Sequence, residues 1–143
     1  MLKKVFLTDE RQWATIPLRV ALGLIFITHG GQKLFGWLGG KGLEGTAAFF
    51  AKMGLAPGVF WAPLAGFGEF IGGILVVLGL GTRLGALFIA VIMIVAILKV
   101  HWGAFFLPGG AEYAFALLGA ALALLIIGGG RLSLDLLIQK KIE

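Results

Sequence analysis

The 143-residue chain contains no cysteine, which excludes disulfides, thiolate-bound metal sites and dithiol redox chemistry. Charged residues are also scarce: they make up 13% of the chain, against about 25% in soluble domains. Apolar residues take their place, since 59% of the chain is hydrophobic and the mean hydropathy is +1.03. This composition predicts a single integral membrane domain over residues 1–143, with the lipid bilayer as its surroundings.

The formal net charge of +5 does not indicate a nucleic-acid-binding protein once the charges are placed. The lysines and arginines lie at the ends of apolar runs, where they follow membrane topology. A cleavable signal peptide is not expected either. Asp9 and Glu10 interrupt the basic start, and Arg19 lies inside the first apolar run.

Four apolar stretches predict helices that cross a bilayer: Trp13–Phe35, Val59–Leu80, Leu84–Val100 and Glu112–Gly128. A spanning helix needs about 20 residues, so the last two stretches are at the short end. Between the first two, Leu43–Met53 predicts a short amphipathic helix at the membrane interface. The expected fold is therefore all-α: a four-transmembrane-helix antiparallel bundle with a short interfacial helix between the first and second spanning helices.

An even number of spans places both termini on one side of the membrane. The basic residues expected on that side are Lys3, Lys4, Arg11, Arg19, Arg83, Arg131, Lys140 and Lys141. Those expected on the other side are Lys33, Lys41, Lys52 and Lys99. The excess on the terminal side favours cytoplasmic N- and C-termini under the positive-inside rule.

Glu69 is the most informative residue, because it lies in the middle of the second apolar run. A carboxylate at that depth is costly and is usually retained for a partner or a function. The residues one turn before and after it are small: Ala65, Gly66, Gly72 and Gly73. Small residues allow another helix to approach closely, so we expect Glu69 to point into the bundle rather than into lipid.

Ionisable residues of all four spans are expected to gather in the outer half of the bundle. His29 and Lys33 end the first span, His101 follows the third, and Glu112 begins the fourth. Glu69 lies about 9 residues, or roughly 14 Å, below the outer start of its span. These residues are therefore candidates for one shared site.

Helical spacing predicts which of these side chains face inward. His101 continues an inward stripe of the third span, while Lys99 is expected to face the lipid headgroups. The packed face of the fourth span is expected to carry Glu112, Ala116, Gly119 and Ala123. At the inner edge, Asp135 is expected to form an ion pair with one of the nearby arginines, which would tie helix ends together.

Two interpretations of the outer cluster stay open. A buried pair such as Lys33 with Glu69 can serve only to fix helix register, because polar contacts between membrane helices contribute about 0.6 kcal/mol on average. Intramembrane ionisable groups also mark ligand pockets and proton paths. A metal site or a haem is disfavoured, because His29 and His101 are the only histidines and no HxxxH or ExxH pair occurs.

Four segments resemble the DoxX family of small four-helix membrane proteins. They are HGGQKLFGWLGGKG (His29–Gly42), EFIGGILVVLGLGTRLGA (Glu69–Ala86), HWGAFFLPGGAEYAFALL (His101–Leu118) and GGGRLSLD (Gly128–Asp135). The resemblance covers most of the chain. It implies a prokaryotic plasma-membrane protein similar to the membrane subunit of thiosulfate:quinone oxidoreductase, with links to quinones and redox stress.

The resemblance implies a quinone-linked oxidoreductase subunit as the first functional hypothesis, with quinone as the cofactor. His29 and His101 would donate hydrogen bonds to the quinone carbonyls, and Lys33 would stabilise developing negative charge. Glu69 and Glu112 would relay protons to the outer face. Whether the chain has catalytic activity by itself stays open.

The aromatic residues near this cluster would form the wall around the quinone ring: Phe26, Trp102, Phe105 and Phe106. Because the chain shows no redox cofactor of its own, electrons would come from a substrate or from a soluble or membrane redox partner subunit. The glycine-rich spans also allow a homo-oligomer.

The alternative hypothesis is a non-enzymatic membrane adaptor, assembly factor or lipid-binding protein. Its partner surface would be the segment Gly36–Gly58 together with the loop Trp102–Gly110, which is apolar for an outer loop. A small transporter is disfavoured, because the chain shows no inverted repeat and is short for alternating access.

Overall fold

The structure, a computed structural model, describes residues 2–106 and 108–142. Over this part of the chain the secondary structure is helical and contains no strand, which confirms the all-α prediction. The elements are α1 (Leu2–Val5), α2 (Thr15–Phe35), the 3₁₀ turn η1 (Trp37–Gly39), α3 (Gly42–Lys52), α4 (Gly58–Leu78), α5 (Thr82–Lys99), α6 (Glu112–Ile127) and α7 (Leu134–Ile142).

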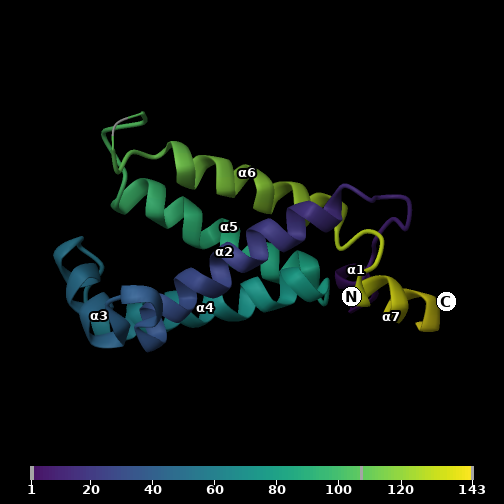
Figure 1. Cartoon of the computed structure of the whole chain (residues 1–143), viewed down its shortest axis with the longest axis horizontal. Coiled ribbons are helices and arrows are strands. Elements are labelled where there is room, and N and C mark those ends of the chain that lie inside the picture. The colour runs from purple at the N-terminus through teal and green to yellow at the C-terminus, as the bar shows by residue number, and fades with distance from the viewer. Residues whose placement is uncertain (1, 107, 143) are drawn as a thin grey trace.

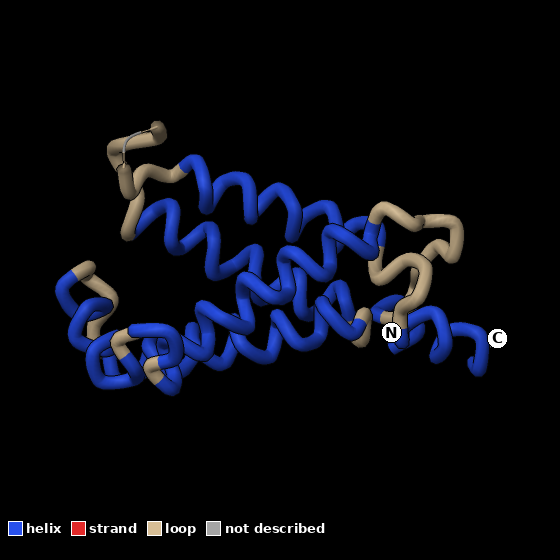
Figure 2. The backbone as a smooth tube through the Cα atoms, in the orientation of Figure 1, coloured by secondary structure: helices blue, strands red, loops and turns tan. Residues whose placement is uncertain are grey.

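The four long helices α2, α4, α5 and α6 alternate in direction along the length of the molecule (Figure 1). Both ends of the described chain lie at one end of the bundle, close to α1 and α7, as predicted (Figure 1). Helix α3 and the α5–α6 connection lie at the opposite end, which we call the α3 end. The pair α2–α4 and the pair α5–α6 diverge toward the α3 end (Figure 2).

Two of the four long helices, α4 and α5, are long and apolar enough to cross a membrane. Helix α6 is equally apolar but has 16 residues, which is short for a spanning helix. Helix α2 has 21 residues and carries Arg19 and Lys33. That all four helices cross the bilayer therefore stays a prediction.

Glycines bring the backbones of α2 and α4 into close contact. A Cβ atom at Gly30 would lie 2.5 Å from the backbone nitrogen of Phe70, and one at Gly23 would lie 2.8 Å from the carbonyl oxygen of Gly73. This is the small-residue packing that membrane helices use to approach one another. The core between the four helices includes Leu22, Phe26, Val76, Ile89 and Leu124.

The predicted amphipathic helix is present as α3. Its residues Ala47 and Phe50 are buried against Ala62 of α4. A Cβ atom at Gly58, the first residue of α4, would collide with the carbonyl of Ala47, so the glycine is needed for this contact. The packing holds α3 across the α3 end of the bundle, where its position at a membrane interface stays a prediction.

The predicted ion pair of Asp135 with an arginine is wrong. Asp135 instead accepts hydrogen bonds at the start of α5, from the backbone N–H groups of Gly81 (2.6 Å) and Thr82 (2.9 Å) and from the Thr82 hydroxyl (2.6 Å). No arginine in residues 2–106 and 108–142 lies within ion-pair distance of it. The first N–H groups of a helix lack intrahelical acceptors, and the oxygens of this buried carboxylate accept their hydrogen bonds instead.

Arg19 has a matching role at the same end of the bundle. Its guanidinium is buried and donates hydrogen bonds to the carbonyl oxygens of Gly129 (2.6 Å), Leu132 (3.1 Å) and Arg131 (3.3 Å). These carbonyls belong to the loop between α6 and α7. Arg19 therefore fixes the C-terminal loop against α2.

Candidate functional site

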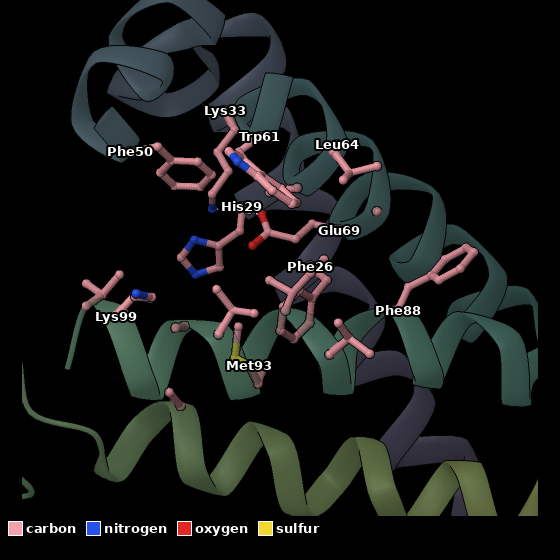
Figure 3. A pocket seen from close by; sticks show the side chains of 18 of the residues that line it. Phe26, His29, Lys33, Phe50, Trp61, Leu64, Glu69, Phe88, Met93 and Lys99 are labelled. Atoms are coloured by element: carbon pink, nitrogen blue, oxygen red, sulfur yellow. Dashed lines mark hydrogen bonds and ion pairs between the residues drawn. The ribbon is translucent and has the colours of Figure 1, made fainter. Parts of the chain in front are cut away.

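A cavity of about 960 Å³ lies where the two helix pairs diverge, at the α3 end of the bundle. Side chains from α2, α3, α4, α5 and α6 line it, and most of them are apolar or aromatic. The polar exceptions are His29, Lys33, Glu69, Lys99, His101 and Tyr113. Figure 3 shows the open space between the His29 side of the wall and α5.

Glu69 and Lys33 form an ion pair in the wall of this cavity. The Lys33 Nζ atom lies 2.8 Å from Glu69 Oε2, and the Glu69 side chain is 3% exposed. A Cβ atom at Gly66 would lie 2.7 Å from the side chain of Leu34, so this glycine lets α2 and α4 come close enough for the pair to form. The prediction that Glu69 faces the bundle is confirmed, and Lys33 is its partner.

His29 lies one helical turn before Lys33 on α2 and is half-buried. Its ring projects into the open space of the cavity (Figure 3). The ring centroid lies 6.5 Å from that of Phe26, which forms the floor beside it. Within residues 2–106 and 108–142 no hydrogen bond engages either ring nitrogen, which leaves them available to a ligand.

His101 and Lys99 line the cavity from the end of α5. The predicted inward position of His101 is confirmed, and its Nδ1 contacts the carbonyl oxygen of Gly109, so one ring nitrogen holds the α5–α6 connection. The expectation that Lys99 and His101 face different ways is wrong, since Lys99 also lines the cavity (Figure 3). Lys99 is exposed, and its contact with lipid headgroups stays a prediction. Helix α5 ends at Lys99, so helical spacing does not extend to His101.

Four predicted site residues do not line the cavity: Trp102, Phe105, Phe106 and Glu112. Trp102 and Phe106 are 75% and 79% exposed in the loop after α5. Leu107, which belongs to the same predicted partner loop, lies outside the described residues. The aromatic residues that do line the cavity with Phe26 are Phe49, Phe50, Trp61, Phe67, Phe88 and Tyr113.

Glu112 lies outside the cavity, and the predicted packed face of α6 is wrong. Glu112, Ala116 and Gly119 are exposed, and a Cβ atom at Gly119 would meet no atom within 4 Å. The buried face instead carries Ala114, Leu117, Ala121 and Leu124. Helix α6 is apolar on all sides, so small residues do not by themselves indicate which face is packed.

Sequence reasoning missed the contribution of α3 and of the first turn of α4. Phe50 of α3 and Trp61 of α4 both lie at the cavity beside Lys33 (Figure 3). Trp61, Ala65 and Glu69 are spaced four residues apart, which puts them on one face of a helix. That spacing was a usable signal, because it places an aromatic ring on the Glu69 face.

The cavity therefore combines a largely apolar wall with a polar group from α2 and α4, and Lys99, His101 and Tyr113 add polar atoms from α5 and α6. His29, Lys33 and Glu69 supply two nitrogen-bearing side chains and a carboxylate to the group from α2 and α4. Within the part of the chain that the structure describes, no group of three or more histidine, aspartate or glutamate side chains is arranged to hold a metal ion. The geometry suits an apolar molecule with polar oxygens at one end.

The DoxX family model matches residues 14–102 of the chain. The chain is also 39% identical over 121 residues to a protein of Bacillus subtilis (strain 168) named "Putative oxidoreductase CatD". This match covers 85% of the chain and 84% of the relative. No solved structure matches the chain.

Proposed function

Because the chain belongs to the DoxX family, whose members are membrane-associated, we propose that it is the membrane subunit of a quinone-linked oxidoreductase. In this proposal α2, α4, α5 and α6 all cross a prokaryotic plasma membrane, the termini are cytoplasmic, and the cavity lies in the outer half. The name of the Bacillus subtilis relative supports oxidoreductase chemistry. The observation that carries the quinone assignment is the buried Lys33–Glu69 pair, which lines the same largely apolar cavity as the His29 ring.

The three polar side chains have distinct roles. Quinone reduction adds two electrons and two protons and gives a quinol, with the charge developing on the carbonyl oxygens. His29 donates a hydrogen bond to one carbonyl oxygen, and Lys33 stabilises the negative charge that develops there. On reduction Glu69 and His29 would each deliver one proton to the quinone oxygens and would then regain it from water at the α3 end, because both line the cavity. The electrons come from a soluble or membrane redox partner subunit.

Tryptophan fluorescence tests this proposal, because quinones quench nearby indole rings. Trp61 lines the cavity, whereas Trp102 is exposed in the loop outside it. A variant that keeps only Trp61 should show saturable quenching by a water-soluble quinone in nanodiscs. A variant that keeps only Trp102 should show weak quenching that does not saturate.

Two matched substitutions then test the polar group. Glu69→Gln should weaken quinone binding about tenfold, the effect of losing about 1.4 kcal/mol of interaction, because it removes the charge that positions Lys33. Glu112→Gln makes the same change at an exposed site outside the cavity and should leave binding unaltered. Equal binding by the two variants, or no saturable binding by the wild type, would exclude the quinone assignment.

A membrane adaptor is the second candidate, and one observation favours it. Trp102, Phe105 and Phe106 are exposed together on the loop at the α3 end, and exposed aromatic residues often mark an interface. Pull-down in a mild detergent separates the candidates. A stable redox protein that is retained by wild type supports the oxidoreductase, whereas a non-redox client lost in Trp102→Ser supports the adaptor.

A further inference from the structure

The cavity extends beyond the buried polar group to the outer surface of the bundle. The same hollow that contains Glu69 is also lined by outward-facing side chains of α4 and α5. On α4, Leu64 and Phe67 are 55% and 50% exposed, and on α5, Val91 and Leu98 are each 52% exposed. A continuous apolar path therefore leads from the buried carboxylate to the outside of the α4–α5 pair.

The path leaves the bundle through a gap in the α4–α5 contact. From the α4–α5 turn to the middle of the helices the contact is tight: a Cβ atom at Gly85 would lie 2.8 Å from the carbonyl oxygen of Gly72, and one at Gly68 would lie 3.0 Å from Ile92. Toward the α3 end the two helices diverge, and the small residues Ala65 and Ala96 line the cavity from either side. Their size leaves the gap unfilled.

The gap faces the surface that lipid would cover. Helices α4 and α5 are the two helices whose length and composition suit a membrane span. Between Leu64 and Ile71 on α4, and between Leu87 and Leu98 on α5, Glu69 is the sole ionisable residue. From Leu64 to Ile71 the groove follows α4 for about 10 Å at 1.5 Å per residue. The groove can therefore hold an extended apolar chain of a ligand. It offers few hydrogen-bond partners to a polar group on that chain.

We propose that this gap is a lateral portal, through which a quinone enters from the bilayer and in which its isoprenoid tail stays when the head lies beside Glu69. This inference rests on the proposed function and adds the substrate class: a lipid-soluble quinone with a long apolar tail. The cavity volume of about 960 Å³ supports it, since pockets of about 300–1,000 Å³ hold whole drug-sized ligands and a single quinone ring fills only part of that space.

Blocking the gap tests the portal. Ala96→Trp places a large ring between α4 and α5, and Ala116→Trp makes the same change on the exposed face of α6. Two quinones are compared in nanodiscs: one without a tail and one with a ten-carbon tail on the same ring. Ala96→Trp should weaken binding of the tailed quinone at least about tenfold, which corresponds to about two methylene groups no longer buried. It should change binding of the tailless quinone less than twofold, and Ala116→Trp should change neither.

Photolabelling of the unaltered protein gives an independent result that does not depend on how a variant folds. A tailed quinone with a diazirine at the end of the tail should label peptides of α4 and α5 near Leu64 and Val91. Excess unlabelled tailed quinone should suppress this labelling. Labelling of α6, or of the exposed loop at Phe105 and Phe106, would overturn the portal.

The outcomes distinguish this inference from the proposed function. If Ala96→Trp affects both quinones equally, or neither, the portal is overturned, while tailless binding that depends on Glu69 still supports the quinone site. If the wild type binds neither quinone, the proposed function fails and the portal fails with it. If only the tailed quinone loses affinity and the label lies on α4 and α5, both are supported.

Discussion

The Lys33–Glu69 pair allows a sharp test of what burial does to an ion pair in this protein. Lys33→Met keeps much of the length of the side chain but removes its charge. Glu69, which is 3% exposed, then loses the partner that lies 2.8 Å away. Breaking a buried pair by removing one partner costs about 3–5 kcal/mol, because the remaining charge stays buried without compensation.

The protein contains a natural control for this change. Lys140 and Glu10 also lie 2.8 Å apart, but their side chains are 58% and 55% exposed. Exposed ion pairs often contribute nothing measurable, because water solvates both charges when the pair is broken. Lys140→Met should therefore leave the stability unaltered, although the two pairs have the same N–O distance.

Thermal unfolding in a mild detergent measures the difference. A loss of 3–5 kcal/mol should lower the midpoint of Lys33→Met on the order of 10 °C, with no shift for Lys140→Met. The double variant Lys33→Met/Glu69→Met should regain most of the loss, since replacing a whole buried pair by apolar residues is often neutral or stabilising. Equal midpoints for Lys33→Met and Lys140→Met, or a double variant less stable than Lys33→Met, would refute the reasoning.

Substitutions at three further sites, with matched controls for two of them, test the ends of the bundle. Asp135→Ala should lower the free energy of unfolding by about 3 kcal/mol, because buried N–H groups of α5 lose a charged acceptor. Asp135→Asn keeps one acceptor oxygen, so its thermal midpoint should fall less than that of Asp135→Ala. Gly58→Ala should lower the midpoint, because its methyl group meets the backbone of α3, whereas Gly119→Ala should leave it unaltered or raise it slightly since that site is open. Arg19→Lys should loosen the C-terminal loop, because the single ammonium nitrogen of lysine cannot replace the two separate guanidinium nitrogens that bind its carbonyls. Trypsin should then cleave after Arg131 faster than in the wild type.

Hydropathy was sufficient to locate the long helices. The ends of the four apolar runs and of the amphipathic segment fall within two residues of the observed α2, α3, α4, α5 and α6. Glu69 was also placed correctly, because its small neighbours marked the face on which another helix packs. The short helices α1 and α7 were not predicted, since neither carries a long apolar run.

The rest of the site could not be read from the sequence, for reasons that differ from residue to residue. Glu112 lies on a helix that is apolar all round, so spacing did not show which face is buried. Trp102 follows the end of α5, where helical periodicity no longer applies. Asp135 binds backbone N–H groups, and such partners leave no trace in a sequence.

The close glycine contacts between α2 and α4 bear on how this molecule can move. Two helices whose backbones touch at Gly23, Gly30 and Gly73 cannot slide or tilt against each other without collisions, so they move as one rigid body. The α5–α6 hairpin has no such contact with α2, and its glycine contact with α4, at Gly72 and Gly85, lies toward the short glycine-containing turn that joins α4 to α5. We therefore expect the main motion of the bundle to be a hinge rotation of this hairpin about that turn. The rotation would widen and narrow the space between the helix pairs at the α3 end.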